Sequence, residues 1–155
     1  MLIDDDRQTK LSGLSHACHE ECNINRELFC TDEFMSPEIA LSLNFDKSVD
    51  IYSFGIILCE IITSKEPSSF CSTTLKEQFF LRKKKQIIFE VNEIKLQHLI
   101  PSDCPEEFEV LAFACCETDS FRRPTVHTCI EELEVILQLF EYSKGTQKFL
   151  FCIYL

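Results

Sequence analysis

The most regular hydrophobic pattern lies in the middle of the chain and predicts a long buried helix. Apolar residues recur there at steps of three and four positions, the spacing of one helix face: Ile51, Phe54, Leu58, Ile61 and Ile62. The intervening Ile56 and Ile57 are also apolar, and a helix that is hydrophobic on nearly every side belongs inside a domain. We expect this helix to end at the stretch from Glu66 to Ser69, which includes a proline.

Two more helices are predicted in the last third of the chain. In the segment CPEEFEVLAFACCE, Pro105 suits the first helical position, and Glu106 and Glu107 suit the positive end of the helix dipole. Thr125 opens the final helix, because its hydroxyl can accept a hydrogen bond from a free backbone N–H group. That helix carries one apolar stripe, formed by Ile130, Leu133, Leu137 and Phe140.

The remaining segments have weaker patterns. Met1–Ile3 and Lys10–Leu11 are predicted as the two short strands of a hairpin, joined by a charged turn. The stretch from Gly13 to Cys30 is polar without a sustained period and is predicted as a loop. Pro37 fits the first turn of a short helix, and Thr74 to Lys85 is predicted as a helix with a basic end.

The composition and charge of the chain exclude some classes of binding partner. The chain has 155 residues, 45% of them hydrophobic, which is enough for one buried core. Its formal net charge of -11 argues against nucleic acid or an anionic membrane surface as a partner, since both bind basic patches. The basic run from Arg82 to Lys85 is short, and we interpret it as a solvated helix face.

Ten cysteines could form a disulfide framework, but we expect reduced thiols in the cytoplasm. No cleavable signal pattern is recognisable, because the apolar start is followed at once by Asp4, Asp5 and Asp6. No apolar stretch reaches the roughly 20 residues of a membrane helix. Four cysteines stand within apolar runs and are predicted to be small core residues: Cys59, Cys115, Cys116 and Cys129.

Three segments in order, FMSPEIA, NFDKSVDIYSFGIILCEII and CPEEFEVLAFACCETDSFRRPTV, resemble the protein-kinase C-lobe. Ser36, Pro37 and Glu38 match the family's A-P-E signature, and the closest resemblance is to the LIM-kinase and testis-specific-kinase branch of the tyrosine-kinase-like serine/threonine kinases. The resemblance implies a mainly α fold with a short N-terminal β-hairpin, a fragment of an α+β kinase domain. It covers the chain from Met1 to about Leu139. The partial kinase domain is expected to span residues 1–142, and residues 143–155 are expected to be a tail.

The resemblance also implies roles for individual residues. Glu38 and Arg123 match a buried ion pair that ties the activation segment to the last helices, and breaking such a pair costs about 3 to 5 kcal/mol. Asp50 matches the Asp that accepts hydrogen bonds from the catalytic-loop backbone, although it also suits a simple helix start. Gly55 belongs to the same structural motif.

Groups that phosphoryl transfer requires are missing from these 155 residues. With three glycines, the sequence has no Gly-rich loop, and neither a strand lysine nor an H-R-D motif is recognisable. Gly13, Leu14 and Ser15 match the second half of a D-F-G-L-S string, but the Asp and Phe are absent. We therefore expect no catalytic residue, no cofactor and no metal in this chain, whereas the intact family uses ATP and magnesium.

Two further features are candidates for regulation. His16, Cys18, His19 and Cys22 offer four zinc ligands, but their spacing fits no zinc pattern, so coincidence is preferred and zinc binding remains the alternative. Thr31 and Ser36 lie where kinases are phosphorylated, although a hydroxyl without a role is an equal alternative.

Three functions remain open. The chain is expected to be the C-lobe portion of a serine/threonine kinase, itself inactive, with proteins as substrates or partners. The alternatives are a pseudokinase-type protein-binding module and a non-functional truncated product. A C-lobe buries one apolar face against the rest of the kinase, so this face is expected to need the missing N-lobe. The sequence encoded upstream would distinguish the three.

Overall fold

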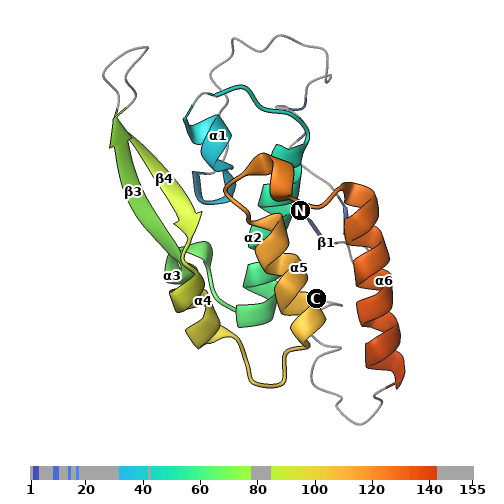
Figure 1. Ribbon diagram of the computed structural model, residues 1–155. Helices are drawn as coiled ribbons and strands as arrows, with labels where there is room; N and C mark the ends of the chain where they lie inside the picture. The colour runs from blue at the N-terminus through green and yellow to red at the C-terminus, as the bar shows by residue number, and fades with distance from the viewer. Residues whose placement is uncertain are drawn as a thin grey trace.

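The chain folds around two central helices. The computed structural model describes residues 2–3, 9–10, 14, 17, 32–41, 43–77 and 85–142. In Figure 1, α2 (Ser48–Thr63) and α5 (Glu106–Cys115) lie in the middle of the molecule. Helix α6 (Val126–Tyr142) lies on one side of them, and a hairpin of β3 (Cys71–Glu77) and β4 (Lys85–Val91) lies on the other. The described part is thus mainly α with small antiparallel sheets, as expected for a kinase C-lobe.

Helix α2 is the predicted hydrophobic helix, and it is buried as expected. Ile56 and Cys59 have no exposed surface, and Tyr52 is also fully enclosed. The helix ends at Thr63, earlier than predicted, because Ser64 adopts a left-handed backbone conformation with φ of 52°. The N–H of Ser64 donates to the carbonyl of Glu60, which satisfies one of the last free carbonyls of the helix.

The core lies mainly between α2 and α5. Its fully buried residues come from both helices and from the segments beside them: Tyr52, Ile56, Cys59, Phe70, Leu96, Phe108, Cys115 and Ile136. The four cysteines predicted to be core residues are all buried, which confirms that prediction. Burial raises the pKa of the neighbouring Cys71 thiol to about 12, so these thiols behave as small apolar groups.

The predicted helix from Thr74 to Lys85 is wrong at both of its ends. Residues up to Glu77 belong to β3, and Lys85 is the first residue of β4. The two strands pair antiparallel, with Cys71 opposite Val91 and Glu77 opposite Lys85. The sequences CSTTLKE and KQIIFEV contain β-branched and aromatic residues, which favour strands. The charge pattern alone could not indicate that β3 and β4, whose first residues are 14 positions apart, supply each other's backbone hydrogen bonds.

The predicted apolar stripe of α6 is also displaced by one position. Ile130 and Leu137 are 49% and 41% exposed, whereas Cys129 and Ile136 are 4% and 1% exposed. Leu133 and Phe140, which the prediction included, pack against the core. Cys129, Leu133, Ile136 and Phe140 also recur at steps of four and three residues, so the helix offers two overlapping apolar stripes. Packing against the core selects this second stripe.

The shorter elements agree closely with the predictions. The N-terminal hairpin is present, with β1 (Leu2–Ile3) paired antiparallel with β2 (Thr9–Lys10). Pro37 is the first residue of α1 (Pro37–Ala40), and Pro105 directly precedes α5. The other short elements are η2 (Asp32–Phe34), α3 (Pro67–Phe70), α4 (Glu93–Leu99) and η3 (Ser120–Arg122). Among the residues that the structure describes, no helix has the length and hydrophobicity needed to cross a bilayer.

Candidate functional site

Glu38 and Arg123 form a buried, two-pronged ion pair. One terminal nitrogen of Arg123 donates to Glu38 Oε1 at 2.6 Å, and the other donates to Glu38 Oε2 at 2.9 Å. The two residues are 85 positions apart in the sequence. Glu38 is 8% exposed and Arg123 is 7% exposed, so water scarcely screens their attraction. The ion pair implied by the resemblance is therefore present in the structure.

Arg123 satisfies all five of its N–H donors. Besides the two bonds to Glu38, its nitrogens donate to the backbone carbonyls of Ser48 at 3.1 Å, Glu117 at 2.7 Å and Thr118 at 3.3 Å. These carbonyls lie at the start of α2 and just after α5. A planar guanidinium can bond to such a divergent set of acceptors because its donors are fixed in a fork. Arg123 therefore joins α1, α2 and the turn after α5 at one point.

Tyr52 completes the surroundings of Arg123. The carbon at the centre of the guanidinium lies 5.0 Å from the centroid of the Tyr52 ring, which is within the range of a cation–π contact. Burial raises the pKa of the Tyr52 hydroxyl, so it stays neutral well above its ordinary range. Tyr52 was not among the residues predicted from the sequence, and the one signal for it is its place in the first turns of the central helix.

The segment from Asp32 to Leu41 is held to α2 at a second point. The Ser53 hydroxyl on α2 donates to the carbonyl of Phe34 at 2.8 Å. Within the segment, Pro37 supplies the preset backbone angle of a helix start, and the N–H of Ala40 donates to the carbonyl of Ser36 at 3.0 Å. The short α1 helix is therefore fixed at both ends of the matched S-P-E motif, by Ser53 before it and by Arg123 at Glu38.

Two of the predicted motif residues lie at the start and middle of α2. Asp50 is in the first turn, as predicted, with its side chain exposed. Asp46, which precedes the N-cap residue Lys47, accepts a hydrogen bond from the N–H of Ser48 at 2.9 Å, a bond that the sequence predictions did not include. The spacing Asp-x-Ser just before an apolar helix is a signal for it. Gly55 faces Cys115 and Cys116 of α5, where the two helices meet.

Of the candidate regulatory residues, the structure describes Ser36 but not Thr31. Ser36 is fully buried, so phosphorylation of its hydroxyl would require the segment to open. Its oxygen has no hydrogen-bond partner among the described residues. Thr31 and the group His16, Cys18, His19 and Cys22 lie outside the described residues. Within the part of the chain that is described, no three His, Cys, Asp or Glu side chains come close enough together to hold a metal ion.

Comparison with known proteins points in the same direction as this geometry. A family model, protein kinase domain, matches residues 1–133. A probable serine/threonine-protein kinase of Dictyostelium discoideum is 38% identical over 104 residues, which cover 67% of this chain and 22% of that protein. From the same organism, the kinase and exchange factor for Rac A is 34% identical over 122 residues, 76% of this chain and 9% of that protein.

A viral protein is similar over a longer stretch. The putative serine/threonine-protein kinase/receptor of Acanthamoeba polyphaga mimivirus is 27% identical over 143 residues, which cover 92% of this chain and 8% of the viral protein. The chain therefore spans less than a quarter of the length of each of these three relatives.

Proposed function

We propose that this chain, which belongs to the protein kinase domain family, is the C-lobe portion of a serine/threonine kinase. The observation that carries the proposal is the Glu38–Arg123 ion pair. It holds the segment with the matched S-P-E motif against α2 and the turn after α5, at the place where the family ends its activation segment. The proposed lobe comprises residues 1–142, and residues 143–155, expected from the sequence to be a tail, lie outside the described residues.

The subgroup is part of the proposal. The string SFGIILCEII and the paired Cys115 and Cys116 support the LIM-kinase and testis-specific-kinase branch of the tyrosine-kinase-like group. The substrates in this branch are protein hydroxyls, so we expect protein substrates or protein partners in the cytoplasm. The names of the relatives, which are serine/threonine kinases, support this substrate class.

By itself the chain is proposed to be inactive. ATP and magnesium serve the intact family, but the residues at the matched D-F-G position do not fit a magnesium site. Magnesium takes oxygen ligands, chiefly carboxylates, and no carboxylate occurs between Lys10 and His16. The described residues of this stretch, Lys10 and Leu14, offer no oxygen ligand in their side chains. The lobe then supports the segment that contacts a substrate and performs no phosphoryl transfer of its own.

A phosphate-transfer assay tests the inactivity. The purified chain is incubated with radiolabelled ATP, magnesium and myelin basic protein, and label in the substrate is counted. We expect no more label than in a reaction without the chain. The control is Arg122→Ala, which changes an exposed neighbour of Arg123. The proposed inactivity would be contradicted by label that depends on the chain. Such label should be lost with Glu38→Ala and retained with Arg122→Ala.

The transcript tests the assignment as a C-lobe portion. We expect the sequence upstream of Met1 to encode, in the same frame, a Gly-rich loop, a strand lysine and an H-R-D motif. In the longer protein, Arg123→Ala should then lower the unfolding temperature far more than Arg122→Ala, because Arg123 bonds to buried Glu38 whereas Arg122 is exposed. A stop codon or unrelated sequence upstream would contradict the assignment and favour a truncated product.

A further inference from the structure

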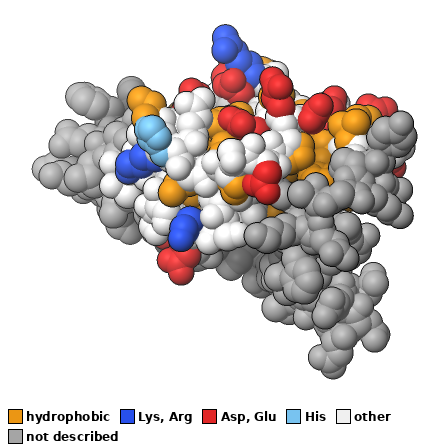
Figure 2. Space-filling view, turned by 90° about the horizontal axis from the view of Figure 1, so that it is seen from below, with side chains coloured by type: hydrophobic (Ala, Val, Ile, Leu, Met, Phe, Trp, Pro, Cys, Tyr) orange, Lys and Arg blue, Asp and Glu red, His pale blue; other side chains and the backbone are white. Residues whose placement is uncertain are grey.

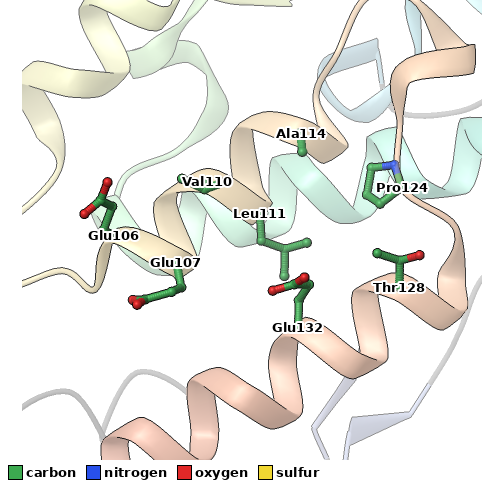
Figure 3. Close-up of a pocket in the computed structure, with 8 residues that line it drawn as sticks. All are labelled: Glu106, Glu107, Val110, Leu111, Ala114, Pro124, Thr128 and Glu132. Atoms are coloured by element: carbon green, nitrogen blue, oxygen red, sulfur yellow. The ribbon is translucent and has the colours of Figure 1, made fainter.

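An open hollow lies between α5 and α6. It encloses about 420 Å³, and its base is apolar, formed by Val110, Leu111 and Ala114 of α5. Figure 3 shows α5 along one side and α6 along the other, with Pro124 near the turn that connects them. Leu111 is buried, but Val110 is 60% exposed, so the hollow presents hydrophobic surface to solvent.

The same hollow has an acidic edge. Glu106 and Glu107 border it on α5, and Glu132 borders it on α6. In Figure 3 the side chain of Glu132 extends toward α5, beside Leu111. No lysine, arginine or histidine is among the residues that line it. Figure 2 shows the face seen from below in Figure 1, where acidic side chains lie among hydrophobic ones.

The basic side chains on the neighbouring segments lie beside other carboxylates. Arg122 lies 3.7 Å from Asp119, and His127 lies 3.3 Å from Glu131. The negative charge of the three glutamates around the hollow is therefore not balanced by a residue that lines it. Because these glutamates are on the surface, a cationic partner can pair with them without a large desolvation cost.

The apolar surface continues along α6 beyond the hollow. Thr128, Glu132, Val135 and Leu139 recur at steps of four, three and four residues, which places them on one face of the helix. Val135 is 48% exposed and Leu139 is 46% exposed. From Thr128 to Leu139 the face is about 16 Å long, at 1.5 Å per residue. This length accommodates three turns of a second helix.

We propose that this groove, formed by Val110, Leu111, Val135 and Leu139 with the three glutamates at its edge, binds a basic amphipathic segment of a partner protein. Apolar side chains one helical turn apart occupy the groove, and lysines or arginines beside them pair with Glu106, Glu107 and Glu132. A second copy of this chain fits less well, because each copy has a formal net charge of -11 and brings like charges together.

This binding function does not depend on phosphoryl transfer. It would give the chain a role in protein interaction, whether or not it forms part of an active kinase. Among the residues that line the groove, only Leu111 also belongs to the buried core.

Fluorescence anisotropy with the full chain tests the proposal. The probe is a labelled helical peptide of about 14 residues, with leucines on one face and lysines beside them. We expect it to bind about tenfold more tightly than a peptide of the same composition in scrambled order, and than one with glutamates in place of the lysines. Raising the salt concentration should weaken binding, because the ionic contacts are on the surface.

Two pairs of variants locate the site. Glu132→Lys should weaken binding about tenfold, whereas Glu134→Lys, the same change at an exposed position on the same helix, should alter it less than about twofold. Val110→Ser should weaken binding about fivefold, and Val126→Ser, which is 58% exposed outside the groove, should have little effect. All four positions are exposed or lie at the edge of the groove, and circular dichroism checks that each variant is folded.

Three results would overturn the proposal. An equal loss of peptide affinity with Glu132→Lys and Glu134→Lys would mean that the peptide responds only to the net charge of the chain. Equal binding of the ordered and scrambled peptides, or no binding of either, would mean that the groove does not recognise an amphipathic segment. Concentration-dependent dimerisation that Val110→Ser abolishes, measured by sedimentation, would identify a second copy as the occupant.

Discussion

A methyl group added at Gly55 of α2 would lie 2.7 Å from the Cβ of Cys115 on α5. It would also lie 3.0 Å from the backbone carbonyl carbon of Cys115 and 2.7 Å from Cys116 Sγ. Real Cβ atoms do not approach other carbons so closely, and two of these three atoms cannot rotate away. The absence of a side chain at Gly55 is therefore what allows the two central helices to pack at this separation.

Gly55→Ala should therefore destabilise the chain, although alanine is the better helix former. The helix gains about 0.5 to 1 kcal/mol from the substitution, but overpacking against a fixed backbone costs about 1 to 3 kcal/mol. We expect a net loss of about 1 to 2 kcal/mol in the free energy of unfolding, measured with urea. The double variant Gly55→Ala/Cys116→Ala should recover only part of it, because Cys115 still blocks the methyl. A single variant as stable as the parent would contradict this packing.

Removing one side of the buried ion pair should be more costly. Arg123→Ala leaves the carboxylate of Glu38 buried without its partner, which costs about 3 to 5 kcal/mol. The adjacent Arg122 is a matched control: its side chain is 72% exposed and pairs with the exposed Asp119, so Arg122→Ala should change stability by less than about 0.5 kcal/mol. Thermal or urea unfolding measures both, and similar losses in the two variants would argue against the ion pair as the anchor.

The two serines near the start of the matched motif should respond oppositely to alanine. Ser36 is buried with no hydrogen-bond partner among the described residues, so Ser36→Ala should be neutral or stabilise by up to about 1 kcal/mol. Ser53 donates to the carbonyl of Phe34, so Ser53→Ala should cost about 1 kcal/mol. A clear loss with Ser36→Ala in urea unfolding would reveal a partner for this hydroxyl.

Adjacent residues on α6 test which stripe faces the core. Ile136 is 1% exposed and Leu137 is 41% exposed. Ile136→Ala should cost about 2 to 4 kcal/mol, and Leu137→Ala should cost less than about 1 kcal/mol. The two changes remove similar volumes from the same helix, so the difference measures burial rather than helix propensity. The reverse order in unfolding experiments would restore the stripe predicted from the sequence.

Stability should fall in alkaline solution because of the buried thiols. Burial raises the pKa of Cys71 to about 12 and that of Cys104 to about 11, and it also raises the pKa of Cys115. An unfolded cysteine ionises near pH 8.5. The folded chain therefore keeps protons that the unfolded chain loses, and the free energy of unfolding falls as pH rises from about 8.5 toward 11.

Urea unfolding at pH 7.5, 9 and 10 in the presence of reductant measures this decline. A fully buried thiol contributes up to about 1.4 kcal/mol per pH unit, and the partly exposed Cys104 contributes less because solvent screens it. Cys115→Ala should give a flatter profile, because one buried thiol is removed. Constant stability from pH 7.5 to 10 would contradict the raised pKa values.

The sequence by itself determined the elements whose signal is local. The apolar spacing from Ile51 to Ile62 specified α2, Pro37 specified the start of α1, and Thr125 specified the cap of α6, where its hydroxyl accepts from the N–H of Thr128 at 3.2 Å. The partners Glu38 and Arg123 were found through the resemblance of short motifs. Local patterns of this kind are fixed by backbone geometry within one or two turns, so no tertiary information is needed.

Only the tertiary structure decided the features that depend on distant neighbours. The segment around Thr74 is a strand because β4 supplies its hydrogen bonds, and α6 buries Ile136 instead of Leu137 because the core selects between two overlapping stripes. The backbone carbonyls that accept hydrogen bonds from Arg123 could not be predicted from the sequence, because every residue has a backbone carbonyl. The matched motif predicted the two partners of the ion pair. Only the packing of α1, α2 and the turn after α5 shows why an arginine with five donors is needed there.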